Sequence, residues 1–345
     1  MSTADWKREP VTATRTLILM KTRILAVPFV LLVTNWSWAA DTTPPQISPT
    51  LLASIRLARD QANSVGGRLW PDFGKAPFGF LVTLANREVL FCHSADVQGF
   101  TRLPPDPTTT CDLQERASVF PKSLLAAMPA IDGISTIVMG TPESTGHSPA
   151  DWTRTIFHEH FHQYQSTFDS YYSRLNDLGL TNGDSTGMWM LNYPFPYAKA
   201  SFTEALTSAS TSLYRAVVSG RSTVKKRVRD YLRARTALEG VVSPDEWKYF
   251  ELELWTEGVA RWTETEISER TSDTRLKASG SAMRKRTIAA LTSMKPRQLR
   301  REIVYPYGAA EAMLLERCAP DWHRGYRQTL SLGALVKAID PKKCR

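Results

Sequence analysis

The chain has 345 residues, of which 42% are hydrophobic and 22% are charged. This composition supports a sizeable buried core and excludes a disordered or collagen-like chain. There are 43 Lys and Arg residues against 34 Asp and Glu residues, which gives a net charge of +9. No run of like charge is long enough to indicate a nucleic-acid tail, so we expect no nucleic-acid partner.

The first 39 residues have the organisation of a secretory signal peptide. Lys21 and Arg23 precede an apolar run over residues 24–33, and Ser37 and Ala39 supply the small residues that a signal peptidase reads. We therefore expect a signal peptide over residues 1–39 and an exported protein, either periplasmic or secreted. The alternative is an N-terminal membrane anchor, but ten apolar residues are about half of what a bilayer span needs. We expect no integral membrane span once the signal is removed.

Translation is expected to start at Met20, because the nineteen residues before it add charge without a pattern. A Pro- and Thr-rich stretch over residues 40–50 predicts a flexible lead-in. Beyond it, the pattern predicts an α+β protein: a small N-terminal mixed sheet within residues 51–147, followed by a mostly helical part over residues 148–345.

The first part contains one helix and several strands. Helical spacing covers residues 51–62, and two apolar runs over residues 78–84 and 88–92 flank Asn86 and Arg87 in the pattern of a β-hairpin. Residues 103–110 are expected to form a Pro- and Thr-rich loop, and residues 134–139 another strand. The helices expected after this part cover residues 149–168, 198–219, 223–238, 244–268, 281–293 and 308–318.

Four cysteines lie after the signal segment, and an even number in an exported chain predicts two disulfides. Pairing by proximity along the chain joins Cys92 to Cys111 and Cys318 to Cys344. Free buried thiols are the alternative. None of the four has the Cys-x-x-Cys spacing of a metal site, so binding of a metal by cysteine is not expected.

The segment from Thr155 to Tyr164 contains the pattern His-Glu-x-x-His. His158 and His162 are one helical turn apart, about 40° round the helix, so both imidazoles can bind one zinc ion. Glu159 lies on a neighbouring face and can reach a water molecule at the metal instead of the metal itself. His160 points to the opposite side and is expected to pack. The sequence therefore predicts one zinc ion per chain.

A catalytic zinc usually has three protein ligands, and the third must come from another element. Two helical candidates follow the motif, Glu257 and Glu204. Gly258 and Ala260 beside Glu257 would allow a ligand helix to approach closely, which favours Glu257 over Glu204. The alternative for Glu257 is a solvated acidic face, since Glu251, Glu253, Glu264 and Glu266 are near it in the sequence.

His158-Glu-x-x-His162 followed by Trp255-x-Glu257-Gly258 resembles the gluzincins, zinc peptidases whose third ligand is a glutamate. The resemblance implies that the helical part is zincin-like and that residues 51–147 and 148–345 form one catalytic unit. The sequence from Tyr305 to Gly308 is similar to the Tyr-x-x-Gly that starts a helix in the aminopeptidases of this class, including the leukotriene A4 hydrolase type. The resemblance implies that Tyr305 donates a hydrogen bond to the oxyanion of the tetrahedral intermediate, with Tyr307 as the second candidate. The Gly-x-Met-Glu-Asn motif that binds a substrate amino terminus in those aminopeptidases is absent.

These features together predict an exported zinc metallopeptidase that acts on a peptide or protein substrate. Two alternatives remain at this level: a non-catalytic binding protein of the cell envelope with the same fold, and a basic envelope protein in which the motif is accidental. Basic segments over residues 221–235 and 275–301 could meet an anionic surface or form solvated helix faces. An aromatic and proline-rich loop over residues 189–197 could line a substrate cleft or serve as a packed connection.

Overall fold

Six strands form one mixed sheet in the computed structural model, which describes residues 47–184 and 186–345. The strand order is β3-β4-β2-β1-β6-β5, and β1 pairs in parallel with β6 while all other neighbours are antiparallel. The α+β class and the mixed sheet are as the sequence predicts. The strands are β1 (Phe80–Thr83), β2 (Arg87–Phe91), β3 (Thr101–Asp106), β4 (Cys111–Ala117), β5 (Leu125–Ile131) and β6 (Ile134–Gly140).

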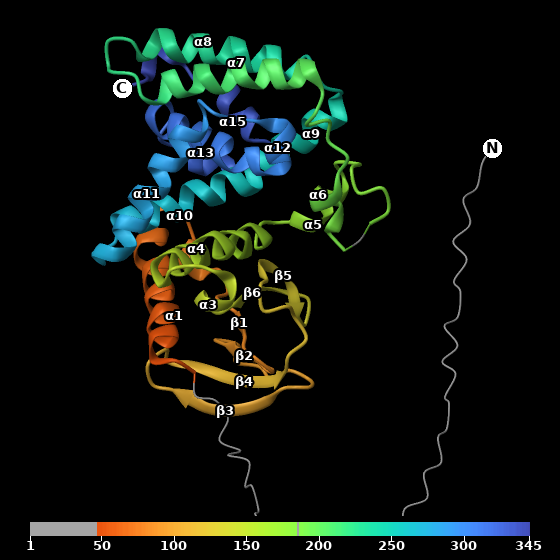
Figure 1. The fold of residues 1–345 in the computed structure, drawn as a ribbon, viewed down its shortest axis with the longest axis vertical. Coiled ribbons are helices and arrows are strands. Elements are labelled where there is room, and N and C mark those ends of the chain that lie inside the picture. The colour runs from red at the N-terminus through yellow and green to blue at the C-terminus, as the bar shows by residue number, and fades with distance from the viewer. Residues whose placement is uncertain (1–46, 185) are drawn as a thin grey trace, which may run out of the picture. The chain divides into compact units, whose positions relative to one another are not determined.

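Helices make up most of the remaining chain (Figure 1). Up to residue 217 they are α1 (Pro49–Gln61), the π-helical turn η1 (Ala62–Gly66), α2 (Gly67–Leu69), the 3₁₀ turn η2 (Phe73–Lys75), α3 (Pro142–Thr145), α4 (Pro149–Ser166), α5 (Tyr171–Asn176), α6 (Met188–Asn192) and α7 (Ala200–Val217). After it they are α8 (Val224–Glu239), α9 (Pro244–Glu253), the π-helical turn η3 (Leu254–Gly258), α10 (Val259–Arg270), α11 (Thr274–Ala290), α12 (Pro296–Leu299), the 3₁₀ turn η4 (Arg300–Ile303), α13 (Val304–Cys318), α14 (Trp322–Tyr326), α15 (Leu332–Lys337) and the 3₁₀ turn η5 (Pro341–Lys343).

Residues 47–345 form one compact unit. The expected signal segment, residues 1–39, and residues 40–46 of the expected lead-in lie outside the described residues. Helix α1 starts at Pro49, slightly before the expected end of the lead-in. Both expected disulfides are present, Cys92–Cys111 and Cys318–Cys344. Within residues 47–184 and 186–345, no helix combines the length and the apolarity that a membrane crossing requires.

Side chains alternate between the two faces along each strand, and the central strands of this sheet bury both sets. Phe80 and Val82 of β1 belong to the main core under the helices, whereas Leu81 between them belongs to a smaller cluster on the other face. That smaller cluster consists of Leu81, Leu90, Val97, Ile131 and Val138. This two-sided burial explains why β1 reads as a continuous apolar run instead of an alternating one.

Helix α4 lies between the sheet and the helical layer (Figure 1). Trp152 near its start donates a hydrogen bond from Nε1 to the Gly140 carbonyl of β6, over 2.8 Å. Gln163 near its end donates from Nε2 to the carbonyls of Gly79 and Ser135, both over 2.9 Å. The opposite side of α4 packs on α10. Both ends of α4 are thus tied to the sheet, which fixes the helix that carries the two motif histidines.

Some expected elements differ from the structure. Residues 103–110 were expected to form a loop, but β3 occupies Thr101–Asp106 as an edge strand of the sheet. Pro104 and Pro105 are tolerated there because an edge strand leaves one row of N–H groups unpaired, and the register shifts between Leu103 and Asp106. The sequence pattern also missed β4 and β5, and α11 starts seven residues before the expected helix at 281.

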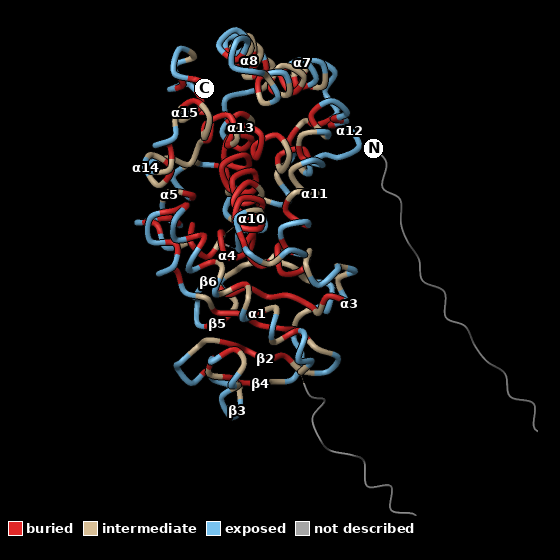
Figure 2. Tube along the Cα trace, turned by 90° about the vertical axis from the view of Figure 1, so that its left-hand side faces the viewer, coloured by how far each residue is buried: buried red, intermediate tan, exposed pale blue. Residues whose placement is uncertain are grey.

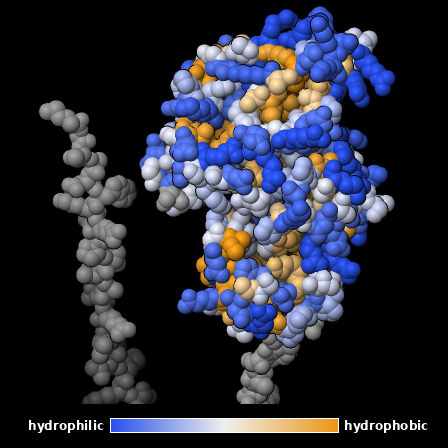
Figure 3. Space-filling view, turned by 180° about the vertical axis from the view of Figure 1, so that it is seen from behind, coloured by the Kyte–Doolittle hydropathy of each residue, from blue (hydrophilic) through white to orange (hydrophobic). Residues whose placement is uncertain are grey.

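The basic segment over residues 221–235 divides into two parts. Lys225, Lys226 and Arg229 are exposed on α8, and hydrophilic residues dominate the upper end of Figure 3, where α7 and α8 lie. Arg235 instead is buried and pairs with Glu251 over 2.5 Å and with Glu311 over 2.6 Å. Most of this segment is therefore a solvated helix face, and its last residue joins a buried ionic cluster.

The centre of the helical layer consists of α10 and α13, which are almost wholly buried (Figure 2). Gly258, at the end of η3, faces Gly308 of α13, and a Cβ added to Gly258 would lie 2.5 Å from the Gly308 Cα atom. The sequence singled out Gly258 as a residue that lets the Glu257 segment approach the motif helix. Because Gly258 has no side chain, α13 instead packs directly against η3 at this point. This contact brings Tyr305, in the first turn of α13, close to the segment that carries Glu257.

Gly258→Ala should lower the free energy of unfolding by about 1–3 kcal/mol, because the added methyl group overpacks the contact with α13. The φ angle of Gly258 is −63°, so the cost is steric and not conformational. Urea denaturation followed by circular dichroism measures it. Gly220→Ala is the matched control, since Gly220 is exposed and nothing lies within 4 Å of an added Cβ. Equal stability of the two variants would contradict this account of the contact.

Candidate metal centre

Helix α4 presents the two motif histidines on one side. The helix begins as the sequence predicts: the Ser148 side chain accepts a hydrogen bond from the Asp151 N–H, and Pro149 occupies the first turn. His158 and His162 are buried or nearly so, and their ring centroids are 4.8 Å apart. His160 points into the core on the other side, where its ring packs on Phe73 and Phe78, as a packing residue should.

Glu257 reaches the two histidines from the π-helical turn η3, which joins α9 and α10 into one continuous helical segment. Its Oε2 atom lies 3.1 Å from Nε2 of His158 and 3.4 Å from Nε2 of His162. A π-helical turn inserts an extra residue into a helix, and such turns are frequent at functional sites. The structure thus brings together the three residues that the sequence selects as metal ligands.

The donor set suits a zinc ion. One ligand atom from each of His158, His162 and Glu257 lies within 4.8 Å of the others. A tetrahedral ion with bonds of about 2.0–2.1 Å holds its ligand atoms roughly 3.3 Å apart, and the two nitrogen–oxygen distances bracket that value. Two imidazoles and one carboxylate are a donor set found at catalytic zinc sites, which keep a fourth position open.

Without a metal ion, the pair formed by His162 and Glu257 binds a proton, which resides on the imidazole. Burial disfavours the charged form of His162, but the Glu257 carboxylate outweighs this effect and raises the pKa of His162 to about 9. Burial also acts to raise the pKa of Glu257, yet His162, His158 and Arg301 hold it well below its ordinary value. A metal ion must therefore displace a proton from this pair, so its affinity should rise with pH.

The two histidines differ at their Nδ1 atoms. Nδ1 of His162 lies 2.8 Å from Oε1 of Gln165, whose amide nitrogen donates to the Tyr326 hydroxyl over 2.7 Å. A hydrogen-bond partner of this kind orients a metal-binding imidazole and leaves its Nε2 atom toward the metal. Nδ1 of His158 has no hydrogen-bond partner among the described residues, and the charged group near it is the Glu264 carboxylate, whose Oε2 atom lies 3.9 Å away.

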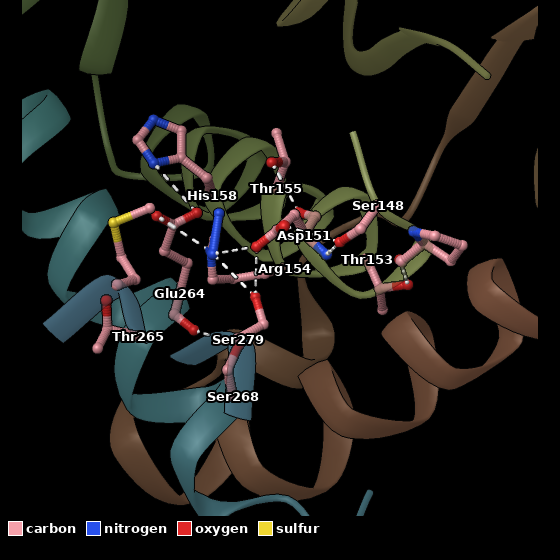
Figure 4. A network of polar contacts seen from close by, with 12 residues as sticks. Ser148, Asp151, Thr153, Arg154, Thr155, His158, Glu264, Thr265, Ser268 and Ser279 are labelled. Atoms are coloured by element: carbon pink, nitrogen blue, oxygen red, sulfur yellow. Dashed lines mark hydrogen bonds and ion pairs between the residues drawn. The ribbon is translucent and has the colours of Figure 1, made fainter. Parts of the chain in front are cut away.

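Glu264 belongs to a buried polar network that continues away from the site (Figure 4). Its Oε1 atom lies 2.8 Å from Nη1 of Arg261 and 3.8 Å from Nε of Arg154. Arg154 in turn contacts Asp151 and Ser279, both over 2.9 Å. The carboxylate near His158 is therefore fixed by residues from α4, α10 and α11.

Glu159, the expected general base, is only 6% exposed. No hydrogen bond or ion pair holds its carboxylate among the described residues. Burial raises its pKa, while His158 and His162 act in the opposite direction. A buried, unpaired carboxylate with a raised pKa is well suited to accept and return a proton.

Tyr305 lies beside the candidate metal ligands, in the first turn of α13. Its ring centroid is 5.8 Å from that of His158, and its hydroxyl oxygen accepts a hydrogen bond from Nη1 of Arg301 over 3.2 Å. Burial raises the pKa of Tyr305, so its hydroxyl stays protonated. The hydroxyl hydrogen thus remains free to be donated to another group.

Two residues of this site were not among the sequence candidates. Arg301 donates from Nη2 to Oε1 of Glu257 over 2.8 Å, and its Nε atom lies 2.7 Å from Oε2 of Glu253. Burial raises the pKa of Glu253 to about 8, with Arg301 opposing that shift. Arg301 ends a basic segment that the sequence offers as a solvated or anion-binding face, and no motif separates it from its neighbours.

The other candidates that the sequence offered for the third ligand and for the oxyanion donor lie away from the two histidines. Glu204 is exposed on α7. Tyr307 is fully buried, and its hydroxyl oxygen accepts a hydrogen bond from the Tyr231 hydroxyl over 3.3 Å. The acidic residues around Glu257 do not form a solvated face, because Glu251, Glu253, Glu264 and Glu266 are all buried and each is paired with an arginine.

The aromatic and proline-rich loop over residues 189–197 is partly packed in the core and partly open to a cavity. Trp189 and Phe195 are buried in the main core. Tyr193, Pro194 and Tyr197 line a cavity of about 540 Å³ together with Arg301. The loop is thus a packed connection on one side and a cavity wall on the other, and Arg301 places that cavity next to the candidate metal centre.

Comparisons of this chain with protein-family models, with curated proteins and with solved structures find no match.

Glu264→Gln should weaken zinc binding about 10- to 100-fold, because the substitution removes the charge beside Nδ1 of His158. Competition with a chromophoric chelator measures the dissociation constant at a temperature where the variant is folded. Glu269→Gln is the matched control: Glu269 is on the same helix and also pairs with an arginine, Arg284, over 2.5 Å. Similar affinities of the two variants would refute the orienting role of Glu264.

Proposed function

We propose that this protein is a zinc-dependent peptidase. The observation that carries the proposal is the convergence of His158, His162 and Glu257 within 4.8 Å, with the unpaired carboxylate of Glu159 on the same helix. The ligand set would hold one zinc ion per chain. When bound, zinc supplies a Lewis acid that polarises the scissile carbonyl and lowers the pKa of a water molecule.

Glu159 acts as the general base in this proposal. Its carboxylate accepts a proton from the attacking water, so that the water oxygen forms a bond to the carbonyl carbon of the peptide. The same group then returns the proton to the amide nitrogen as the carbon–nitrogen bond breaks, which releases an amine and a carboxylic acid; the acid then gives its proton to the amine, so that the products are a carboxylate and an ammonium group. Burial raises the pKa of Glu159, and a carboxylate with a raised pKa is a stronger base for the proton of the attacking water.

Tyr305 stabilises the oxyanion that forms during attack. Its hydroxyl oxygen accepts a hydrogen bond from Arg301, which leaves the hydroxyl hydrogen for the developing negative charge. Arg301 also holds Oε1 of Glu257, so one guanidinium group positions both the proposed metal ligand and the proposed oxyanion donor. Tyr307 has a different partner in a buried cluster, which supports the choice of Tyr305.

We also propose that the protein works outside the reducing cytosol. The two disulfides, Cys92–Cys111 and Cys318–Cys344, are compatible with an exported protein. Export to the periplasm or the medium agrees with the expected signal segment, and the substrate would then be a peptide or protein of that compartment.

Metal analysis tests the ligand set directly. The protein purified without chelator should contain about one zinc per chain by plasma mass spectrometry. Glu257→Ala should lose the metal because a buried ligand is removed, whereas Glu204→Ala should keep it because Glu204 is exposed on α7. Absence of zinc from the parent protein, even after incubation with the ion, would overturn the proposal.

Glu159→Gln should lower kcat on a peptide library by at least about 10²-fold while leaving the zinc content unchanged, because the amide cannot accept the proton. Gln163→Glu is not suitable as a control, since Gln163 ties α4 to the sheet. Gln165→Asn is the comparison variant, because it disturbs the hydrogen-bond partner of His162 without changing Glu159. It should lower the affinity for zinc, whereas Glu159→Gln should lower kcat at unchanged zinc content. Turnover that survives in Glu159→Gln would exclude Glu159 as the base. Zinc binding without turnover of any peptide in the parent would favour a binding protein.

A further inference from the structure

The cavity next to the candidate metal centre is not used by the mechanism above. It has a volume of about 540 Å³, which is within the usual range for ligand pockets. Its wall shares Arg301 with the metal centre, since Arg301 also donates to Glu257. It is lined by Leu191, Asn192, Tyr193, Pro194, Tyr197, Tyr249, Leu299, Arg300, Arg301 and Glu302.

One side of the cavity is apolar. The rings of Tyr193 and Tyr249 stack with their centroids 4.2 Å apart and an interplanar angle of 12°. Leu191 is 55% exposed and Leu299 is 41% exposed, although both are large apolar residues. Aromatic and leucine side chains left open at the mouth of a cavity are typical of a surface that packs on the aliphatic part of a ligand.

The hydroxyl of Tyr197 is buried, with Tyr197 only 6% exposed, and it has no hydrogen bond of standard geometry among the described residues, although the Tyr249 side chain lies close to it. Burial and the Glu253 carboxylate raise its pKa, while Tyr249, Arg301 and Arg300 act in the opposite direction, so charges of both signs lie near the hydroxyl. Buried polar groups in folded proteins almost always have partners. A hydroxyl in the wall of a cavity that makes no hydrogen bond of standard geometry can donate one to a ligand group that enters the cavity.

Arg300 is the cation that the cavity offers to a ligand. Arg301 is engaged by Glu253, Glu257 and the Tyr305 hydroxyl, whereas Arg300 is exposed and forms no ion pair within the described part of the chain. The backbone of Arg300 has φ 48° and ψ −124°, a conformation that side chains rarely adopt. Glu302 is the acidic residue of the lining and supplies a matched control on the same segment.

We propose that this cavity is the specificity site of the peptidase and that it binds a carboxylate of the substrate. Arg300 makes the ionic contact, the Tyr197 hydroxyl donates a hydrogen bond, and the Tyr193–Tyr249 wall packs on the adjoining aliphatic part. This inference rests on the proposed peptidase function. The carboxylate belongs either to an acidic side chain or to the C-terminus of a peptide, and both sources offer the same chemistry.

Binding of small blocked peptides tests the inference without turnover. The full-length Glu159→Gln protein, with zinc added, is titrated by calorimetry with acetyl-Phe-Gln-amide, acetyl-Phe-Glu-amide and acetyl-Phe-Gln with a free C-terminus. At least one of the two acidic probes should bind about tenfold more tightly than the neutral probe, the size of a hydrogen bond to a charged group. The probe that gains affinity identifies the source of the carboxylate.

Variants of the lining assign this preference to Arg300. Arg300→Gln should abolish the tenfold difference while the neutral probe binds as before, and Arg300→Lys should restore part of it. Tyr197→Phe should reduce the preference, and Glu302→Gln should maintain or increase it. Equal affinity of all three probes for the parent, or a preference that survives Arg300→Gln, would overturn the inference.

Failure of the inference and failure of the proposed function are distinguishable. A protein that binds zinc and hydrolyses peptides, but shows no preference for a carboxylate, would retain the proposed function and lose the specificity site. A protein without zinc would lose the proposed function. The titrations would still report whether the cavity selects a carboxylate, since neither Arg300 nor Tyr197 is a metal ligand.

Discussion

The carboxylate of Glu257 is the group on which this part of the structure depends. It is buried between two imidazoles and a guanidinium group, where an uncompensated negative charge would cost several kcal/mol. His158 and His162 approach Oε2, and Arg301 approaches Oε1. This division leaves one oxygen to a guanidinium and the other toward the histidines, which is the arrangement that a metal ligand with an outer partner requires.

The neighbouring acidic residues obey the same constraint. The helical segment formed by α9, η3 and α10 carries four further buried glutamates, and each is paired with an arginine from its own helix or from another element. Breaking such a pair leaves a buried charge without compensation, so these arginines are required once the glutamates are buried. Part of the arginine content of this chain is therefore structural. The exposed basic residues of α8 are a separate, solvated group.

Packing brings the other components to the candidate metal centre. Helix α4 is fixed to the sheet by Trp152 and Gln163 and packs on α10 on its other side. Gly258 and Gly308 let α13 approach η3 at backbone distance, and α13 carries Tyr305. The turn before α13 carries Arg300 and Arg301, which link the centre to the adjoining cavity. Three segments distant in the sequence thus meet at one place: hydrogen bonds to the sheet position α4, and the two glycines allow α13 to approach η3.

The sequence by itself determined the α+β class, both disulfides and the helix with His158, Glu159 and His162, because local periodicity, capping and cysteine spacing depend on neighbouring residues. It also ranked Glu257 above Glu204 through the small residues beside it. Only the tertiary structure decided that Arg301, Glu253 and Glu264 surround the centre, that Tyr305 and not Tyr307 lies beside His158, and that strands β4 and β5 complete the sheet. These are ionic and cross-strand pairings between residues far apart in the chain. The sequence around a glutamate or an arginine is the same whether its side chain is solvated or buried in an ion pair, so the sequence alone does not reveal the pairing.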